Sequence, residues 1–184
     1  FRRVLFRSWK RELWFDATGL PWQNPSPNMR NLNAATLYPG VGLLEYAISV
    51  GRGTDTPFEV LGAPYVDDLL LSHELNALGL PGVRFVPQRF TPTASVFSGK
   101  LCGGVRLIIT DRERLRAVDL GLAIGHTLHR LYPEQFDLEK FNTLLNHPAS
   151  IAQIKEGRSW TGIAVDWEQQ ASSFRQRRQP YLMY

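Results

Sequence analysis

The chain has 184 residues and a formal net charge of +4, and 43% of its residues are hydrophobic. This length fits one domain, and no apolar run approaches the roughly 18 residues that a membrane-spanning helix needs. The basic residues gather near the two ends and no aromatic-interleaved basic stripe joins them, which argues against a nucleic-acid-binding protein. The single cysteine, Cys102, excludes an internal disulfide.

Residues 9–64 are rich in proline, glycine and asparagine, as in the stretch LPWQNPSPNM. Proline fixes φ and removes a backbone donor, so this part of the chain is expected to be mostly ordered loop. Residues 32–44 allow one short helix, which we expect to be interrupted near Pro39 and Gly40.

Residues 58–110 alternate between strand and helix patterns. The stretch PFEVLGAP predicts a strand, and Asp67 is a suitable cap for a helix that ends near Leu78. The stretches VRFVPQRF and GVRLIIT predict two further strands, which are joined by the polar loop TPTASVFSGKLCG.

The last part of the chain is predicted to be helical. An apolar face recurs at helical spacing over residues 118–132, and again from Trp160 through Ile163, Trp167 and Ala171 to Phe174, with Pro180 ending the second helix. We interpret both stripes as core. The sequence therefore predicts an α+β fold, in which a small mixed β-sheet packs against helices and the C-terminal region is helical.

Several catalytic motifs are absent from the sequence. GRGTDT, at residues 51–56, lacks the Gly-Lys-Ser/Thr of a phosphate-binding loop and the third glycine or alanine of a dinucleotide fingerprint. His126 and His129 are three residues apart on a predicted helix, but beyond Glu134 no third ligand stands near, so a surface pair is favoured over a metal site. We expect no metal and no cofactor.

A first candidate site is the polar arc of Asn24, Ser26 and Asn28. Intervening prolines hold these amide and hydroxyl groups in a stiff arrangement, as recognition of sugar hydroxyls requires. The alternative is a turn whose side chains satisfy its own backbone.

A second candidate site contains Glu45, Ser49 and Arg52. Glu45 follows two leucines, and an apolar setting can raise the pKa of a carboxyl and suit it to acid catalysis. The alternative is an ion pair between Glu45 and Arg52 that holds a loop in place.

Several motifs occur in an order that resembles the C-terminal part of the exo-β-N-acetylmuramidase family: GLPWQNPSPNM, LYPG, LLE, GRGTDTPFEVLGAP, LPGVRF, FTPT, LCGGV and RRQPYLMY. The resemblance covers residues 9–184, as a single C-terminal domain. Residues 1–8, FRRVLFRS, do not resemble the family and are expected to be a cloning or assembly remnant. Between Glu45 and Ser49 the chain is also shorter than the family pattern, which includes an asparagine there.

The resemblance implies a larger, two-domain glycoside hydrolase. Family members carry an N-terminal Rossmann-like domain before this one, and the active site lies between the two. They release N-acetylmuramic acid from the non-reducing ends of peptidoglycan fragments without a nucleotide cofactor. The main catalytic carboxylate is expected in the other domain, so this chain would be a substrate-binding half, periplasmic or secreted. The alternative is a non-catalytic carbohydrate-binding or interaction module.

The resemblance also assigns expected roles to side chains. N-acetylmuramic acid carries a lactyl carboxylate, which matches the planar donor fork of Arg52, while Gly53 allows close backbone approach. The remaining expected contacts are Ser49 and Thr54 in support of Arg52, Asn24 and Asn28 at hydroxyl or acetamido groups, and Tyr65 or Phe90 against the sugar ring. Glu45 is kept as the candidate catalytic carboxyl of this chain.

Overall fold

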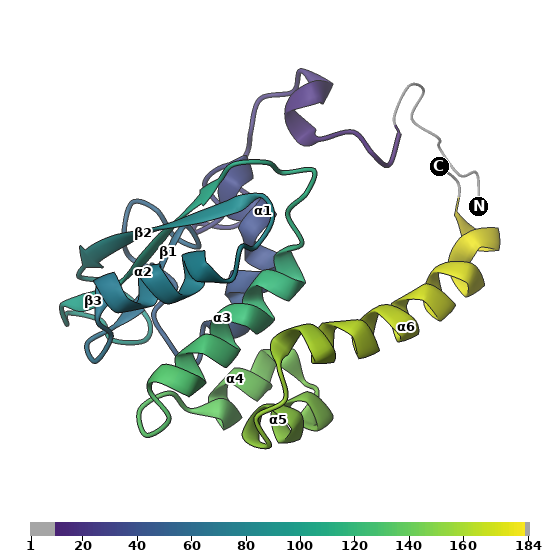
Figure 1. Ribbon diagram of the computed structural model, residues 1–184. Helices are drawn as coiled ribbons and strands as arrows, with labels where there is room; N and C mark the ends of the chain where they lie inside the picture. The colour runs from purple at the N-terminus through teal and green to yellow at the C-terminus, as the bar shows by residue number, and fades with distance from the viewer. Residues whose placement is uncertain (1–9, 183–184) are drawn as a thin grey trace.

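The computed structural model describes residues 10–182. The elements in chain order are η1 (Phe15–Thr18), α1 (Leu32–Val41), η2 (Gly42–Leu44), β1 (Val60–Ala63), α2 (Asp68–Ala77), β2 (Val83–Phe90), β3 (Cys102–Ile109), α3 (Ala117–Leu131), α4 (Leu138–Leu145), α5 (Pro148–Lys155), α6 (Trp160–Arg178) and η3 (Gln179–Tyr181) (Figure 1). None of the helices within residues 10–182 is long and apolar enough to span a membrane.

The strands form one three-stranded sheet in the order β1-β3-β2. The predicted α+β class is confirmed, but the sheet is antiparallel in both of its pairings and not mixed. A mixed sheet needs a parallel pair with a crossover connection, whereas β2 and β3 form a hairpin and β1 adds to the other edge of β3. Helix α2 packs on this sheet, and α3 runs beside α2 (Figure 1).

The helix predicted after Asp67 is confirmed, and its cap is the expected one. The Asp67 side chain accepts a hydrogen bond from the backbone N–H of Leu70 at 2.9 Å. The interruption expected near Pro39 and Gly40 is wrong, because α1 passes through Pro39 to Val41 and η2 follows directly. Helices α4 and α5 were not predicted, since eight residues give too short a periodic pattern.

The centre of the helical layer is a direct contact between the backbones of α1 and α3. A Cβ atom added at Gly40 would lie 1.7 Å from the carbonyl oxygen of Ala117, and one added at Gly121 would lie 2.4 Å from the carbonyl oxygen of Gly40. Only glycine permits this approach. The contact brings the buried side chains Leu37 and Leu120 into one core.

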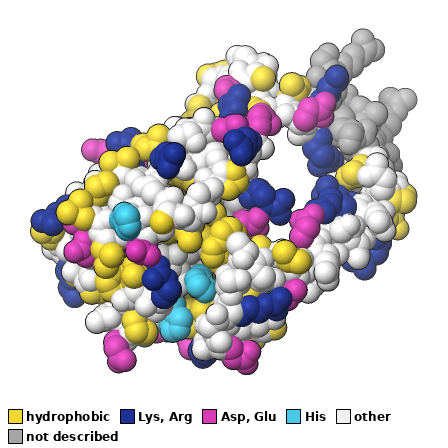
Figure 2. Space-filling view, viewed as in Figure 1, with side chains coloured by type: hydrophobic (Ala, Val, Ile, Leu, Met, Phe, Trp, Pro, Cys, Tyr) yellow, Lys and Arg dark blue, Asp and Glu magenta, His cyan; other side chains and the backbone are white. Residues whose placement is uncertain are grey.

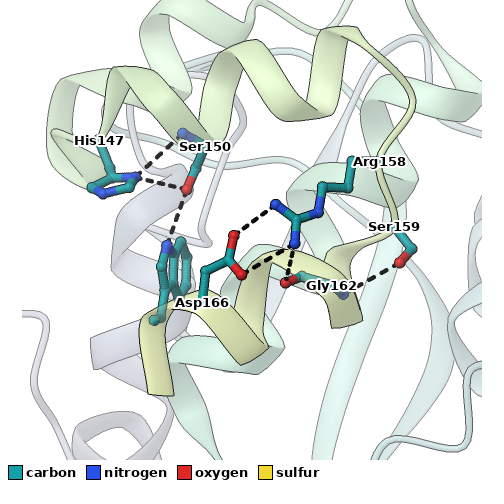
Figure 3. A network of polar contacts seen from close by, with 7 residues as sticks. His147, Ser150, Arg158, Ser159, Gly162 and Asp166 are labelled. Atoms are coloured by element: carbon teal, nitrogen blue, oxygen red, sulfur yellow. Dashed lines mark hydrogen bonds and ion pairs between the residues drawn. The ribbon is translucent and has the colours of Figure 1, made fainter. Parts of the chain in front are cut away.

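The first half of α6 is fastened to α5 by a polar network (Figure 3). The indole N–H of Trp167 donates to the Ser150 hydroxyl at 3.0 Å, and that hydroxyl lies 2.7 Å from Nδ1 of His147, which caps α5. Nearby, the guanidinium of Arg158 donates to Asp166 at 2.6 Å. Trp167 therefore joins two helices through both its ring and its N–H group.

The second apolar stripe is core only in part. Ile163 is fully buried, and Trp160 and Trp167 pack against the core, as predicted. The prediction is wrong for Phe174, which is 51% exposed. Helix α6 extends beyond the sheet and the other helices, so its apolar stripe continues where no core lies beneath it (Figure 1).

Replacing Gly40 with alanine tests the backbone contact. On an exposed helix this change would stabilise by about 1 kcal/mol through helix propensity. Here it should instead lower the free energy of unfolding by about 2 kcal/mol or more, because a backbone must shift. Urea denaturation measures the change. Gly99→Ala is the control, since Gly99 has φ +75° and open space around it, so it reports left-handed strain alone. Equal costs would contradict a specific α1–α3 contact.

Replacing Trp167 separates its two contributions. Trp167→Phe removes the hydrogen bond to Ser150 but keeps an aromatic ring, and should cost about 1 kcal/mol. Trp167→Ala also removes the packing and should cost about 3 kcal/mol. Both values come from denaturation curves of the same protein preparation. A cost below about 1 kcal/mol for the alanine variant would show that α6 is not anchored through this side chain.

Candidate functional site

Residues 51–56 form a loop whose shape depends on its two glycines. Gly51 and Gly53 have φ values of 77° and 80°, in the left-handed region that favours glycine. Just before the loop, Ser49 exchanges two backbone hydrogen bonds with Gly62 of β1, at 3.0 and 2.9 Å. The glycines on both sides of Arg52 are therefore explained by backbone conformation and close packing.

The loop rests against the segment that follows β2. The Thr93 hydroxyl donates to the carbonyl oxygen of Gly53 at 2.8 Å, and an added Cβ at Gly53 would lie 2.5 Å from the backbone nitrogen of Ala94. The loop is thus held from the β1 side and from the segment after β2. This rigidity fixes the position of the Arg52 side chain.

Arg52 forms an ion pair with Glu45. Its Nη2 and Nε donate to the same carboxylate oxygen, Oε2, at 2.7 and 3.3 Å. The guanidinium also lies over the ring of Phe58, with its carbon 5.1 Å from the ring centroid. In this geometry Glu45 accepts hydrogen bonds from a cation. Of the two interpretations of Glu45 left open by the sequence, the structure therefore shows the ion pair.

Phe58, which lies under the guanidinium, has a strained backbone conformation. Its φ is 65°, a value that a bulky side chain seldom adopts. The strain is offset by burial of the side chain and by a hydrogen bond from its N–H to the carbonyl oxygen of Val50 at 2.8 Å. The ring also meets Tyr38 edge-on at 4.8 Å between centroids.

The hydroxyl groups of Ser49 and Thr54 serve the loop itself. Ser49 is 2% exposed and its hydroxyl accepts from the N–H of Gly51 at 3.4 Å. Thr54 donates to the carbonyl oxygen of Gly51 at 2.7 Å. Both hydroxyls thus bond the loop that carries Arg52, and the burial of Ser49 opposes its direct contact with a ligand. The role in support of Arg52 that we expected for both residues stays a prediction.

The tertiary structure joins the two candidate stretches. Arg30, which follows the polar arc, lies 3.7 Å from Asp55 of the loop. Asn31 caps α1 through its Oδ1 and donates from Nδ2 to Oε1 of Glu59 at 2.7 Å. Loop 51–56 and the segment before α1 thus form one polar surface.

Within the polar arc, Asn24 and Ser26 are exposed and Asn28 is half-buried. Asn24 accepts a hydrogen bond from the indole N–H of Trp22 at 3.1 Å, and the backbone of Ser26 closes a turn with Met29. The backbone therefore forms the turn that was the alternative interpretation of this stretch. The exposed amide and hydroxyl groups are still free to meet a ligand.

The two aromatic candidates pack in clusters of apolar and aromatic side chains. Phe90 is 8% exposed and packs with Val60 and Cys102 in a small second core, so it offers no accessible face. Tyr65 meets Phe97 and Tyr132 edge-on, and burial raises the pKa of its hydroxyl to about 12. The expected ring contact is therefore wrong for Phe90, and Tyr65 belongs to an aromatic cluster.

Glu59 is the residue that sequence reasoning missed. It is a carboxylate only 6% exposed, and Asn31 is its hydrogen-bond partner. A single acid directly before a buried strand, in PFEVLGAP, was the available signal, because an acid in that place needs a specific partner.

His126 and His129 lie on α3, and burial lowers the pKa of both imidazoles. Within residues 10–182 no group of three or more His, Cys, Asp or Glu side chains could hold a metal ion. The polar surface around Arg52 remains the candidate site of this chain.

Comparison with known proteins identifies the family of the chain. A sequence model of the family described as "Exo-beta-N-acetylmuramidase NamZ, C-terminal" matches residues 36–184. The peptidoglycan β-N-acetylmuramidase NamZ of Bacillus subtilis (strain 168) is 42% identical over 185 residues, which cover 98% of this chain and 45% of that protein. The chain thus spans less than half the length of this relative.

Two solved structures share the fold. Both are DUF1343 family proteins of Bacteroides fragilis NCTC 9343. One has a TM-score of 0.85 at 27% identity and matches 96% of this chain and 48% of its own. The other has a TM-score of 0.64 at 29% identity and matches 88% of this chain and 43% of its own. Since the family model matches residues 36–184 and the relatives share the fold, this chain belongs to the NamZ C-terminal family of exo-β-N-acetylmuramidases.

Proposed function

We propose that this chain is the substrate-contacting C-terminal half of a periplasmic or secreted enzyme that releases N-acetylmuramic acid from the non-reducing ends of peptidoglycan fragments during cell-wall recycling. The observation that carries the proposal is the oriented guanidinium of Arg52 on a polar surface, in a chain 42% identical to a peptidoglycan β-N-acetylmuramidase.

The contacts of Arg52 leave room for a second anion. A guanidinium has five N–H donors, and the two hydrogen bonds to Glu45 come from Nε and Nη2. Nη1 makes no hydrogen bond among the described residues, and the side chain is 27% exposed. A lactyl carboxylate can therefore approach the guanidinium from the side of Nη1, while Glu45 holds the side formed by Nε and Nη2. Glu45 is then a positioning residue.

The other polar groups suit the rest of the sugar. Asn24, Ser26 and Asn28 lie on the segment that Arg30 ties to the loop, and they offer amide and hydroxyl contacts to sugar hydroxyls or to the acetamido group. Because Glu45 is already engaged by Arg52, we place the main acid catalyst in the N-terminal half of the longer enzyme. The non-catalytic binding module differs in predicting no turnover after that half is added.

Activity should require the other half. The chain alone should release no N-acetylmuramic acid from a chromogenic muramide. A fusion of the N-terminal half of the B. subtilis relative to residues 10–184 should release it, because the fusion completes the cleft. Release of the chromophore from the muramide measures the activity of the chain alone and of the fusion. A fusion that folds and binds the sugar without turnover would favour the non-catalytic module, and turnover by the chain alone would place the catalyst here, with Glu45→Gln as the next variant.

Arg52 should determine the preference for muramic acid. In the active fusion, Arg52→Ala should lower kcat/KM for the muramide by about 100-fold, since a carboxylate loses its charged partner. The loss should be much smaller for the matching glucosaminide, which has no lactyl group. Arg52→Lys should restore only part of the activity, because an ammonium lacks the planar fork.

The control is Arg30→Ala, which removes the exposed pair with Asp55 and should affect both sugars alike. Denaturation of the same variants checks the fold. If Arg52→Ala slows both sugars equally, or destabilises the protein by a matching amount, Arg52 only fastens the loop.

A further inference from the structure

Helix α6 carries one apolar stripe with two different surroundings. Ile163 and Phe174 are eleven residues apart, which is close to three turns, so they point to the same side of the helix. Ile163 is buried against the body, whereas Phe174 is 51% exposed. The same stripe that anchors the helix therefore continues into solvent.

The far half of α6 is exposed over more than one full turn. Residues 173–177 are all exposed, and five consecutive residues cover more than one full turn of a helix. Figure 1 shows this half running away from the sheet and the other helices. Figure 2 shows an opening between it and the body, with charged side chains of both signs around the rim.

Local interactions give this half little support. Arg175 pairs with Glu168, and the guanidinium of Arg177 lies 5.5 Å from the ring centroid of Phe174. Isolated helices shorter than about 12–15 residues are marginal in water, so a few exposed turns without packing are poorly stable on their own. An apolar stripe there indicates a partner surface.

Unpaired polar groups point to the same surface. Nε of Arg178 is buried and has no hydrogen-bond partner within residues 10–182, and neither Arg177 nor Arg178 has an ion pair there. Tyr181, just beyond the helix, is 80% exposed. A partner that covers Phe174 and Tyr181 with apolar side chains and brings carboxylates to the guanidinium groups of Arg177 and Arg178 would complement this surface.

We propose that Phe174, Arg177, Arg178 and Tyr181, named here the arm surface, dock onto the N-terminal half of the longer family proteins. The relatives are about twice as long as this chain, and the family match is to their C-terminal part, so the remaining half precedes it. Arg177, Arg178 and Tyr181 of the arm surface belong to the RRQPYLMY motif, to which the proposed function gives no role.

The opening suits such a neighbour. The segment before α1 is tied to the turn before α3, where Arg112 donates to Asp16 at 2.7 Å and Trp14 donates to Glu113. On the other side, Arg116 joins α3 to α6 through Glu168 at 3.2 Å. A domain entering here would contact the arm surface on the side where the apolar stripe faces. The proposal rests on the two-part arrangement of the proposed function and not on its chemistry.

Hydrogen exchange tests the docking without any activity. In the isolated chain, the amides of residues 173–182 should exchange rapidly. In the fusion with the N-terminal half of the B. subtilis relative, they should exchange at least 10-fold more slowly. The full-length relative, compared with its own C-terminal half at the aligned segment, gives the same test with a natural interface.

Variants then locate the contact. Phe174→Glu should leave the stability of the isolated chain unchanged but abolish the added protection in the fusion. Leu69→Glu is the matched control, because Leu69 is 68% exposed on α2. This variant should change neither the stability of the isolated chain nor the added protection in the fusion. An equally slow exchange in the isolated chain, or no added protection in both the fusion and the relative, would overturn the proposal. Protection that rises with concentration in the isolated chain would overturn it in favour of a second copy of this chain.

Discussion

The backbones of α1 and α3 touch where Gly40 faces Gly121, and this contact sets the course of the chain after α1. The chain turns through η2, presents Glu45 at its end and then pairs with β1 at Ser49 and Gly62. Side chains at either glycine would force the helices apart, and α1 with its attached loop would move away from the sheet. The position of Arg52 thus depends on a contact between two residues that never meet a ligand.

The candidate site is an assembly of short loops made rigid by polar contacts. Glu45 and Phe58 hold the guanidinium of Arg52 from two directions, and Thr93 holds the loop from a third. Asn31 joins the cap of α1 to the buried carboxylate of Glu59. Such preorganisation lowers the entropy lost on binding, which favours the recognition of a sugar acid that we propose for this surface.

Helix α6 shows the same sequence pattern under two physical conditions. Its first half is packed through Trp167 and tied by the Ser150 hydroxyl, while its far half has the same apolar stripe and no core beneath it. Burial gives the first half its stability, and the far half must take its stability from elsewhere. The arm surface and the candidate site lie on different elements, so the proposed docking and the proposed substrate recognition can be tested by separate mutations.

Local patterns in the sequence were enough to place α2, α3 and the β2 strand, because a cap such as Asp67 and an apolar face such as Leu120, Ile124 and Leu128 act within a few residues. The motif order also identified the family. Only the tertiary structure decided that the sheet is antiparallel, that Phe90 is buried and that Phe174 is exposed. Burial depends on which distant segments meet, and a helical stripe looks the same whether a core or solvent lies against it. The pairing of Arg30 with Asp55 and of Asn31 with Glu59 joins residues more than twenty positions apart, and no local pattern encodes such a contact.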